Sequence, residues 1–170
     1  MRMWRLAFTF MLISMPMVAQ VQEEPLSKEE VAMFARYHVD DVFRGKPTMP
    51  DMRDPDVRMY GTRLRYAAEH GANFAGHYAM AVWGCGSGCI VLAAIDLRSG
   101  KVTYFPGAVS WDREKNYGVR FQKNSRAIHA VGALNEEDSA DRWYVWTGQQ
   151  FKLIAKKPAE LEPDEPDTTQ

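Results

Sequence analysis

The sequence predicts an α+β fold in which two N-terminal helices pack on an antiparallel meander of about seven short strands. Two observations carry this prediction. Apolar residues recur at helical spacing between residues 26 and 70, whereas from residue 74 onward short runs are rich in strand-forming residues. Tight turns separate most of these runs, and tight turns join antiparallel neighbours.

The first helix is expected to begin directly after Ser27. Ser27 and Glu30 form the S-x-x-E pattern of a capping box, and Leu26 and Val31 stand where a hydrophobic staple places its two apolar residues. The side chains of the predicted buried face recur every three or four residues, at Val31, Phe34, Ala35, His38, Val39 and Val42. Gly45 and Pro47 are expected to end the helix.

A second helix is expected to begin at Pro55 and to stop at Gly71. Asp54 is a favoured capping residue, and proline suits the first helical position. Several small residues lie on the predicted buried face: Gly61, Ala67 and Ala68. They indicate close packing against a flat surface, which we expect to be the sheet.

Seven segments are expected to form the strands. They are residues 77–83, 90–97, 102–105, 118–122, 127–134, 142–146 and 150–154. Turns rich in Gly, Ser, Asn and Asp join them. Trp143, Tyr144 and Trp146 share one segment, so one of its faces is expected in the core and the other is a candidate exposed aromatic patch for a sugar or a partner.

Residues 1–19 have the pattern of a cleavable export signal. Arg2 and Arg5 precede an uncharged, mostly apolar run, and a cut is expected after Ala19. The run is shorter than the ~20 residues that a membrane-spanning helix needs. We therefore expect a periplasmic or secreted protein with no stable membrane insertion once the signal has been removed.

Residues 26–157 are expected to form a single α+β domain. The apolar fraction of 46% is sufficient for one core. Residues 158–170 are rich in proline and acids without apolar periodicity, which predicts a disordered acidic tail. The domain has a small excess of basic residues but no clustered stripe of basic and aromatic side chains, so we expect no nucleic-acid partner.

The most distinctive segment joins Asn73–Tyr78 to Trp83–Cys89. Its letters read N-F-A-G-H-Y and then W-G-C-G-S-G-C, and a D-L-R-S-G-K turn follows at Asp96–Lys101. This pattern resembles a group of uncharacterised exported bacterial proteins with an N-F-x-G-H-[YF] segment, then W-G-C-G and a second cysteine. The resemblance implies an exported location and a shared fold, and it implies no activity.

Cys85 and Cys89 are the only cysteines. In a protein bound for an oxidising compartment they predict a local disulfide that pins a glycine-rich loop. A redox pair is an alternative, although thiol oxidoreductases place C-x-x-C at a helix start and here a strand follows. A metal site made of both cysteines and His77, with His129 as a further ligand, is another alternative, but the spacing matches no zinc motif. We expect no metal and no cofactor.

His77 is the candidate general base of this sequence, although a strand histidine is more often a hydrogen-bonded core residue. No acid lies near it in the sequence, and Asp96 or Asp112 are the acids that the fold could bring to it. The glycines around Ser87 match neither a G-x-S-x-G elbow nor a nucleotide-binding loop.

The sequence therefore predicts an exported binding module for an unknown protein or ligand. The candidate binding residues are those around the cysteine loop and its aromatic neighbours: Asn73, His77, Tyr78, Trp83, Gly86 and Ser87. The alternative is a small extracytoplasmic enzyme that uses His77 near Cys85 and Cys89.

Overall fold

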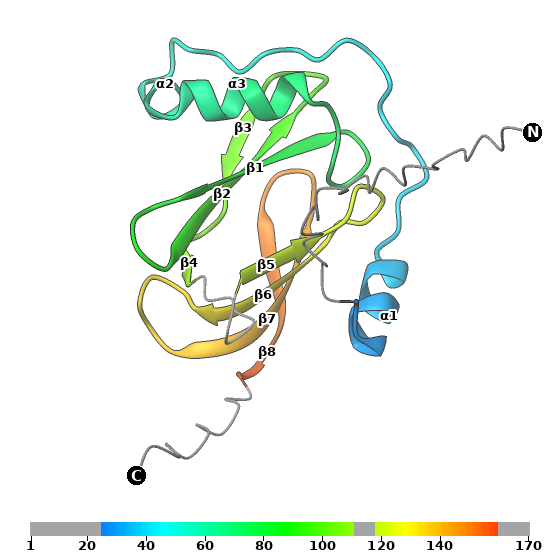
Figure 1. The fold of residues 1–170 in the computed structure, drawn as a ribbon. Helices are drawn as coiled ribbons and strands as arrows, with labels where there is room; N and C mark the ends of the chain where they lie inside the picture. Colours follow the sequence, from blue (N-terminus) through cyan, green and yellow to red (C-terminus); the bar gives the residue numbers. More distant parts are fainter. Residues whose placement is uncertain (1–24, 111–117, 160–170) are drawn as a thin grey trace, which may run out of the picture.

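The computed structural model of the chain describes residues 25–110 and 118–159 and has an α+β fold with antiparallel sheets, as predicted (Figure 1). The predicted export signal, Asp112 and residues 160–170 of the predicted tail lie outside the described residues. Within the described ranges the chain forms three helices and eight strands in two four-stranded sheets. No helix in these ranges is long and apolar enough to cross a membrane.

Helix α1 spans Lys28–Arg36 and starts as predicted. The backbone N–H of Ser27 donates to Glu30 Oε2 at 2.8 Å, and the backbone N–H of Glu30 donates to Ser27 Oγ at 3.1 Å. The two residues of the predicted staple, Leu26 and Val31, are both exposed.

The end of α1 comes earlier than the sequence predicts. After Arg36 the chain leaves the helix because it pairs with a distant turn: the backbone N–H of Val39 donates to the carbonyl oxygen of Asn124, and His38 forms a β-bridge with Ser125. This long-range pairing satisfies backbone groups that a longer helix would have bonded internally.

The predicted second helix is divided into α2, Pro55–Met59, and α3, Gly61–Glu69. Asp54 caps α2 as predicted, because its carboxylate accepts the backbone N–H of Asp56 at 2.9 Å. Tyr60 interrupts the helix with non-helical backbone angles. As predicted for a helix with small residues on one face, α3 lies over the first sheet, where its buried Leu64 and Ala68 share a core with β1 and β2 (Figure 1).

The first sheet has the strand order β1-β2-β3, and β4 also pairs with β2. The strands span Tyr78–Gly84, Cys89–Asp96, Val102–Tyr104 and Val109–Ser110. In the long β1–β2 hairpin Tyr78 pairs with Asp96, and Gly84 pairs with Ile90.

The second sheet has the order β5-β6-β7-β8. Its strands span Gly118–Phe121, Ala127–Ala133, Ser139–Trp146 and Phe151–Pro158. Pro158, which was expected to begin the tail, is the last residue of β8.

The main core lies between the two sheets. Side chains from β1 and β2 meet side chains from β6 and β7 there: Tyr78, Met80, Leu92, Ala94, Ile128, Ala130, Tyr144 and Trp146. Because each sheet needs a partner for its apolar face, two packed sheets replace the single meander that the turn pattern suggested. The prediction of an exposed aromatic patch on β7 is wrong, because both faces of the strand are covered. Trp146 lies in the core between the sheets, Trp143 packs edge-on against Phe34 of α1, and both tryptophans are only 2% exposed.

Candidate binding pocket

The turn before β1 has an uncommon backbone conformation. Ala75 has φ 43° and Gly76 has φ 80°, although residues with a Cβ seldom adopt positive φ. The backbone N–H groups of Ala75 and Gly76 donate to the carbonyl oxygens of Ser125 and Lys123 at 3.1 and 2.7 Å. A Cβ on Gly76 would collide with the carbonyl oxygen of Asp41. The surrounding chain therefore holds this turn in place, and the turn presents His77.

His77 lies in a pocket of about 240 Å³ between the two sheets. The pocket is lined by Val39, Asp41, Ala75, His77, Tyr78, Arg126, Trp146, Thr147 and Gly148. The His77 side chain is 24% exposed, and its Nε2 lies 3.8 Å from Asp96 Oδ1. Asp96 is itself held by its own turn, because its carboxylate accepts the backbone N–H of Arg98 and the hydroxyl of Ser99 at 2.9 Å each.

The surroundings of His77 favour the neutral imidazole. Burial lowers the pKa of His77, and the nearby Arg98 guanidinium lowers it further, while Asp96 and Asp41 oppose them. The Asp41 carboxylate is itself paired with Arg98 at 2.5 Å. A neutral imidazole offers one N–H donor and one acceptor nitrogen to a molecule in the pocket.

The opposite wall of the pocket comes from the second sheet. Arg126 precedes β6 and is an exposed residue, and its Nη1 donates to the carbonyl oxygen of Trp146 at 3.5 Å. The Thr147 hydroxyl donates to the carbonyl oxygen of Gln150 and also accepts backbone N–H groups within the same turn. The lining therefore supplies hydrogen-bonding groups, but the Thr147 hydroxyl already bonds within its own turn.

Two of the predicted binding residues meet in this pocket. His77 and Tyr78 both line it, and their ring centroids lie 4.2 Å apart. Burial raises the pKa of Tyr78, so its hydroxyl keeps its proton at neutral pH.

The other predicted binding residues lie elsewhere. The Asn73 side chain bonds to both backbone groups of Met80 on β1. Trp83 is buried beneath α2 and α3, with its ring 4.8 Å from that of Tyr60. Gly86 and Ser87 are exposed in the hairpin loop between β1 and β2.

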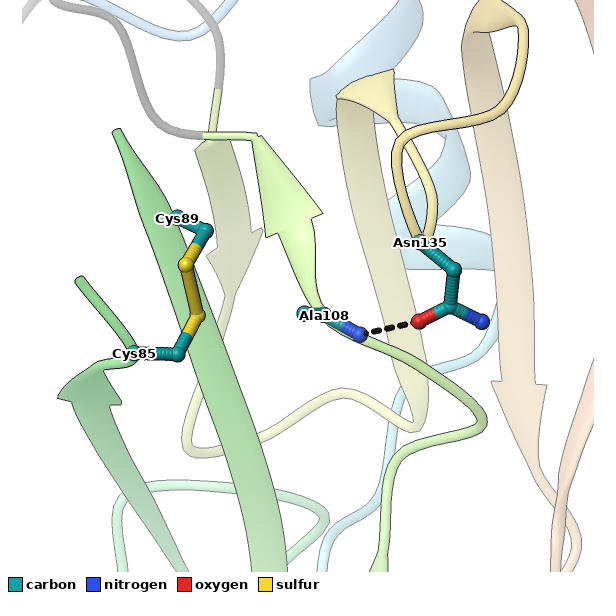
Figure 2. Close-up of a disulfide and its surroundings, with 4 residues drawn as sticks. All are labelled: Cys85, Cys89, Ala108 and Asn135. Atoms are coloured by element: carbon teal, nitrogen blue, oxygen red, sulfur yellow. Dashed lines mark hydrogen bonds between the residues drawn. A yellow bond between two sulfur atoms is a disulfide. The ribbon is translucent and has the colours of Figure 1, made fainter. Parts of the chain in front are cut away.

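Cys85 and Cys89 form the predicted disulfide (Figure 2). Their Cα atoms lie 5.5 Å apart, and the backbone N–H of Cys85 donates to the carbonyl oxygen of Cys89 at 3.1 Å. The loop follows β1 whereas His77 precedes it, so eight residues separate them, or roughly 25 Å at the rise of an extended strand. The alternatives that join His77 to these cysteines, as an enzyme site or a metal site, therefore lack the required proximity.

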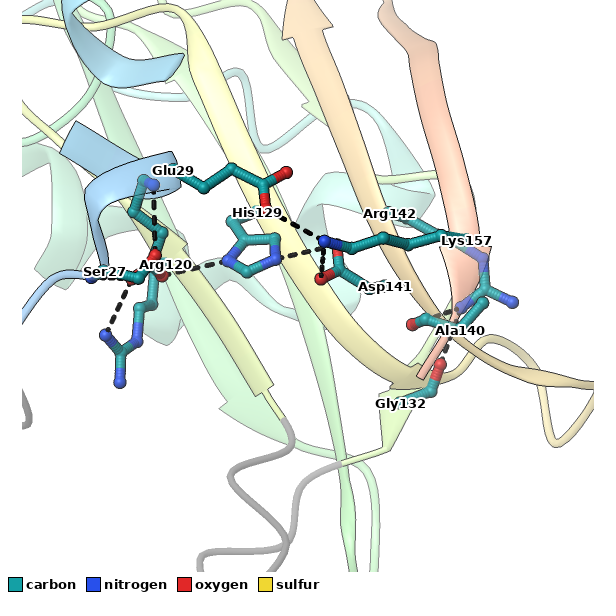
Figure 3. Close-up of polar contacts among 10 residues, drawn as sticks. Ser27, Glu29, Arg120, His129, Gly132, Ala140, Asp141, Arg142 and Lys157 are labelled. Carbon is teal, nitrogen blue, oxygen red and sulfur yellow. Dashed lines mark hydrogen bonds and ion pairs between the residues drawn. The ribbon is translucent and has the colours of Figure 1, made fainter. Parts of the chain in front are cut away.

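A second polar cluster connects α1 to the second sheet (Figure 3). His129 on β6 lies between two carboxylates: its Nδ1 is 2.9 Å from Glu30 Oε1, and its Nε2 is 2.9 Å from Asp141 Oδ1. Arg120 approaches Glu30 at 3.3 Å, and Lys157 approaches Asp141 at 3.5 Å. Burial would raise the pKa of Glu30, but its hydrogen bond from Ser27 and its contacts with His129 and Arg120 lower it on balance.

Sequence reasoning did not find this cluster or the pocket residues Asp41, Arg126 and Thr147. Glu30 was assigned only a capping role, and the residues that it meets are about 90 or more positions away. Arg126 and Thr147 stand in or beside predicted turns, and only the pairing of the turns shows that they share a wall with His77.

The resemblance to exported bacterial proteins stays a prediction. No family model, curated protein or solved structure matches this chain.

Proposed function

We propose that this protein is an exported binding module whose ligand occupies the His77 pocket. The observation that carries the proposal is the pocket itself, which brings a neutral histidine, two aromatic rings and an arginine together between the two sheets. Concave sites with an apolar lining and a few placed polar groups are typical of ligand-binding sites.

The backbone of the turn supports a functional role for His77. An alanine in the left-handed region costs on the order of 1 kcal/mol or more, and such residues cluster where a side chain must be held in one position. Ala75 is that residue here, directly before Gly76 and His77.

Export is part of the same proposal. The Arg2 and Arg5 start, the apolar run and the expected cut after Ala19 support removal of a signal peptide. The Cys85–Cys89 disulfide is compatible with the oxidising compartment to which such a signal leads. The likeness to exported bacterial proteins points in the same direction.

The test is a binding screen of the exported protein by NMR. Small carboxylates, amines, neutral aromatic compounds and sugars are titrated while the backbone amide signals are followed. We expect at least one class to shift the signals of residues 75–78 and 147–148 saturably, and we expect Val39→Trp, which fills the pocket from one wall, to abolish the shifts. If no class produced saturable shifts in a folded protein, the proposal would be wrong.

Enzymatic use of His77 is a second candidate, favoured by the Asp96 carboxylate 3.8 Å from its Nε2. Such a pair can orient an imidazole that acts as a general base. The two functions differ in the fate of a saturating ligand. A binding module returns the ligand unchanged, whereas an enzyme gives a product that mass spectrometry detects with the wild-type protein and not with His77→Gln.

A further inference from the structure

The pocket carries one permanent cation without an acidic partner. Within residues 25–110 and 118–159 Arg126 makes no ion pair, and its one side-chain hydrogen bond goes to the carbonyl oxygen of Trp146. That bond occupies one nitrogen of the guanidinium and leaves its other donors for a ligand. Asp41 also lines the pocket, and its Oδ2 is paired with Arg98 at 2.5 Å, whereas no ion pair joins it to Arg126 among the described residues.

Apart from Arg126 and Asp41, which is paired with Arg98, the lining is apolar or neutral. Val39, Ala75 and the rings of Tyr78 and Trp146 form its walls, while neutral His77 adds an N–H donor. A volume of about 240 Å³ lies below the roughly 300–1,000 Å³ of pockets for drug-sized molecules. It suits a body the size of one amino-acid side chain.

The charges around the pocket favour a monoanion. A guanidinium matches the planar, two-oxygen face of a carboxylate with parallel hydrogen bonds. A phosphate dianion would carry a second negative charge close to Asp41 and Asp96, and among the lining residues only Arg126 is a cation, since the nearby Arg98 is already paired with Asp41. A ligand with an ammonium group would be repelled by the Arg126 guanidinium.

From these observations we infer that the ligand is a carboxylate with a single apolar or aromatic group. Its carboxylate lies on Arg126 with His77 as a second donor, and its apolar group packs on Tyr78 and Trp146. This inference rests on the proposed function of the pocket. A free organic acid and the C-terminal residue of a peptide share this chemistry.

The test compares four probes by calorimetry and NMR with the exported protein: 3-phenylpropionate, its primary amide, phenethylammonium, and a Gly-Gly-Ala-Phe peptide with a free C-terminus. We expect the carboxylates to bind at least about tenfold more tightly than the amide, since a hydrogen bond to a charged group is worth more than a neutral one. Binding of the free acid alone identifies a small-molecule ligand, and binding of the peptide identifies a chain terminus.

Arg126→Gln should weaken carboxylate binding about tenfold or more and leave the amide affinity unchanged, while Arg126→Lys should restore part of the loss. Arg65→Gln, which removes an exposed arginine from α3, is the matched control and should change nothing. Tighter binding of phenethylammonium, or equal binding of acid and amide, would overturn the inference and leave the pocket a binding site. Absence of binding by every probe class in the broader screen would instead overturn the proposed function.

Discussion

Gly76 shows how a single residue fixes the position of His77. Its φ of 80° is accessible to glycine, and the carbonyl oxygen of Asp41 occupies the space that a side chain would need. Both constraints act at the residue directly before the histidine. The position of the pocket's main polar group therefore depends on a residue that contributes no side chain.

We predict that Gly76→Ala lowers the free energy of unfolding by at least about 2 kcal/mol, because the left-handed conformation and the collision both oppose it. Gly71→Ala is the matched control: Gly71 has φ 84°, but no atom lies within 4 Å of an added Cβ. It should cost only about 1 kcal/mol. Urea denaturation measures both values, and equal losses would show that the close approach to Asp41 has no energetic weight.

The lowered pKa of His77 predicts a pH dependence. Because the folded state binds this proton less readily than the unfolded state, the contribution of His77 to stability is present above its unfolded pKa of about 6.5 and declines as the pH falls toward the folded pKa. Arg98→Gln should raise the folded pKa, since it removes a cation and frees the Asp41 carboxylate. NMR titration of the imidazole signals measures the folded-state pKa of His77 in the wild type and in the variant. An unchanged pKa in the variant would contradict the assigned cause.

At the scale of an element, one carboxylate both caps α1 and joins it to two residues of the second sheet. Glu30 closes the helix's own capping box and also contacts His129 and Arg120 from the sheet (Figure 3). Both ring nitrogens of His129 face carboxylate oxygens, so both contacts are hydrogen bonds only when both nitrogens carry hydrogen. The helix start and the tertiary contact therefore depend on the same side chain.

We predict that Glu30→Gln costs about 3 kcal/mol, although glutamine can still complete a capping box, because it removes the charge of a buried carboxylate that contacts both His129 and Arg120. Glu29→Gln is the control: the Glu29 side chain is 53% exposed and pairs with Lys157, so its loss should cost less than about 1 kcal/mol.

The effect of Glu30→Gln on stability is expected to depend on pH. The pKa of Glu30 is lowered in the folded state, so its stabilisation is present above its unfolded pKa and is lost as the pH falls through the folded value. The difference in free energy of unfolding between wild type and Glu30→Gln should therefore shrink between pH 7 and pH 3. A constant difference would assign the effect to packing.

On the scale of the whole molecule, the disulfide and the pocket lie at opposite ends of β1. We predict that replacing Cys85 and Cys89 together by serine lowers the free energy of unfolding by about 1–3 kcal/mol, because a short ring removes little entropy from the unfolded chain. Ligand affinity at His77 should stay within twofold of wild type. A large loss of affinity would mean that the hairpin transmits changes along its length.

Export predicts the covalent state of the mature chain. Protein recovered from the cell envelope or the medium should begin near Gln20 and contain no free thiols when denatured without reductant. Intact mass spectrometry with thiol labelling measures both properties. A cytoplasmic product that retains Met1 would contradict the proposed compartment.

Features set by neighbouring residues could be predicted from the sequence, and features set by distant pairing could not. The capping box of α1, the Asp54 cap, the Asp96–Lys101 turn and the disulfide all involve residues within five positions of one another. The end of α1 and the division into two sheets depend on pairing between segments far apart in the chain, which leaves no local pattern.

The candidate site divides in the same way. His77 stood out from its own segment, whereas its Asp96 neighbour was one of two acids that remained possible. Arg126 and Thr147 join the pocket only because the second sheet packs against the first. Periodicity identifies which face of a strand is buried, and it does not identify which other sheet covers that face.

The side chain of Asn73 has a consequence for how copies of this protein behave beside one another. On the free side of β1 the backbone groups of Tyr78 bond to Phe74, and those of Met80 bond to the Asn73 amide, which supplies both a donor and an acceptor. A strand from another molecule would need these same groups to extend the sheet. The Asn73 amide thus takes the place of an additional strand. Because these bonds are intramolecular, the first half of this edge is not available for pairing with a strand of another copy.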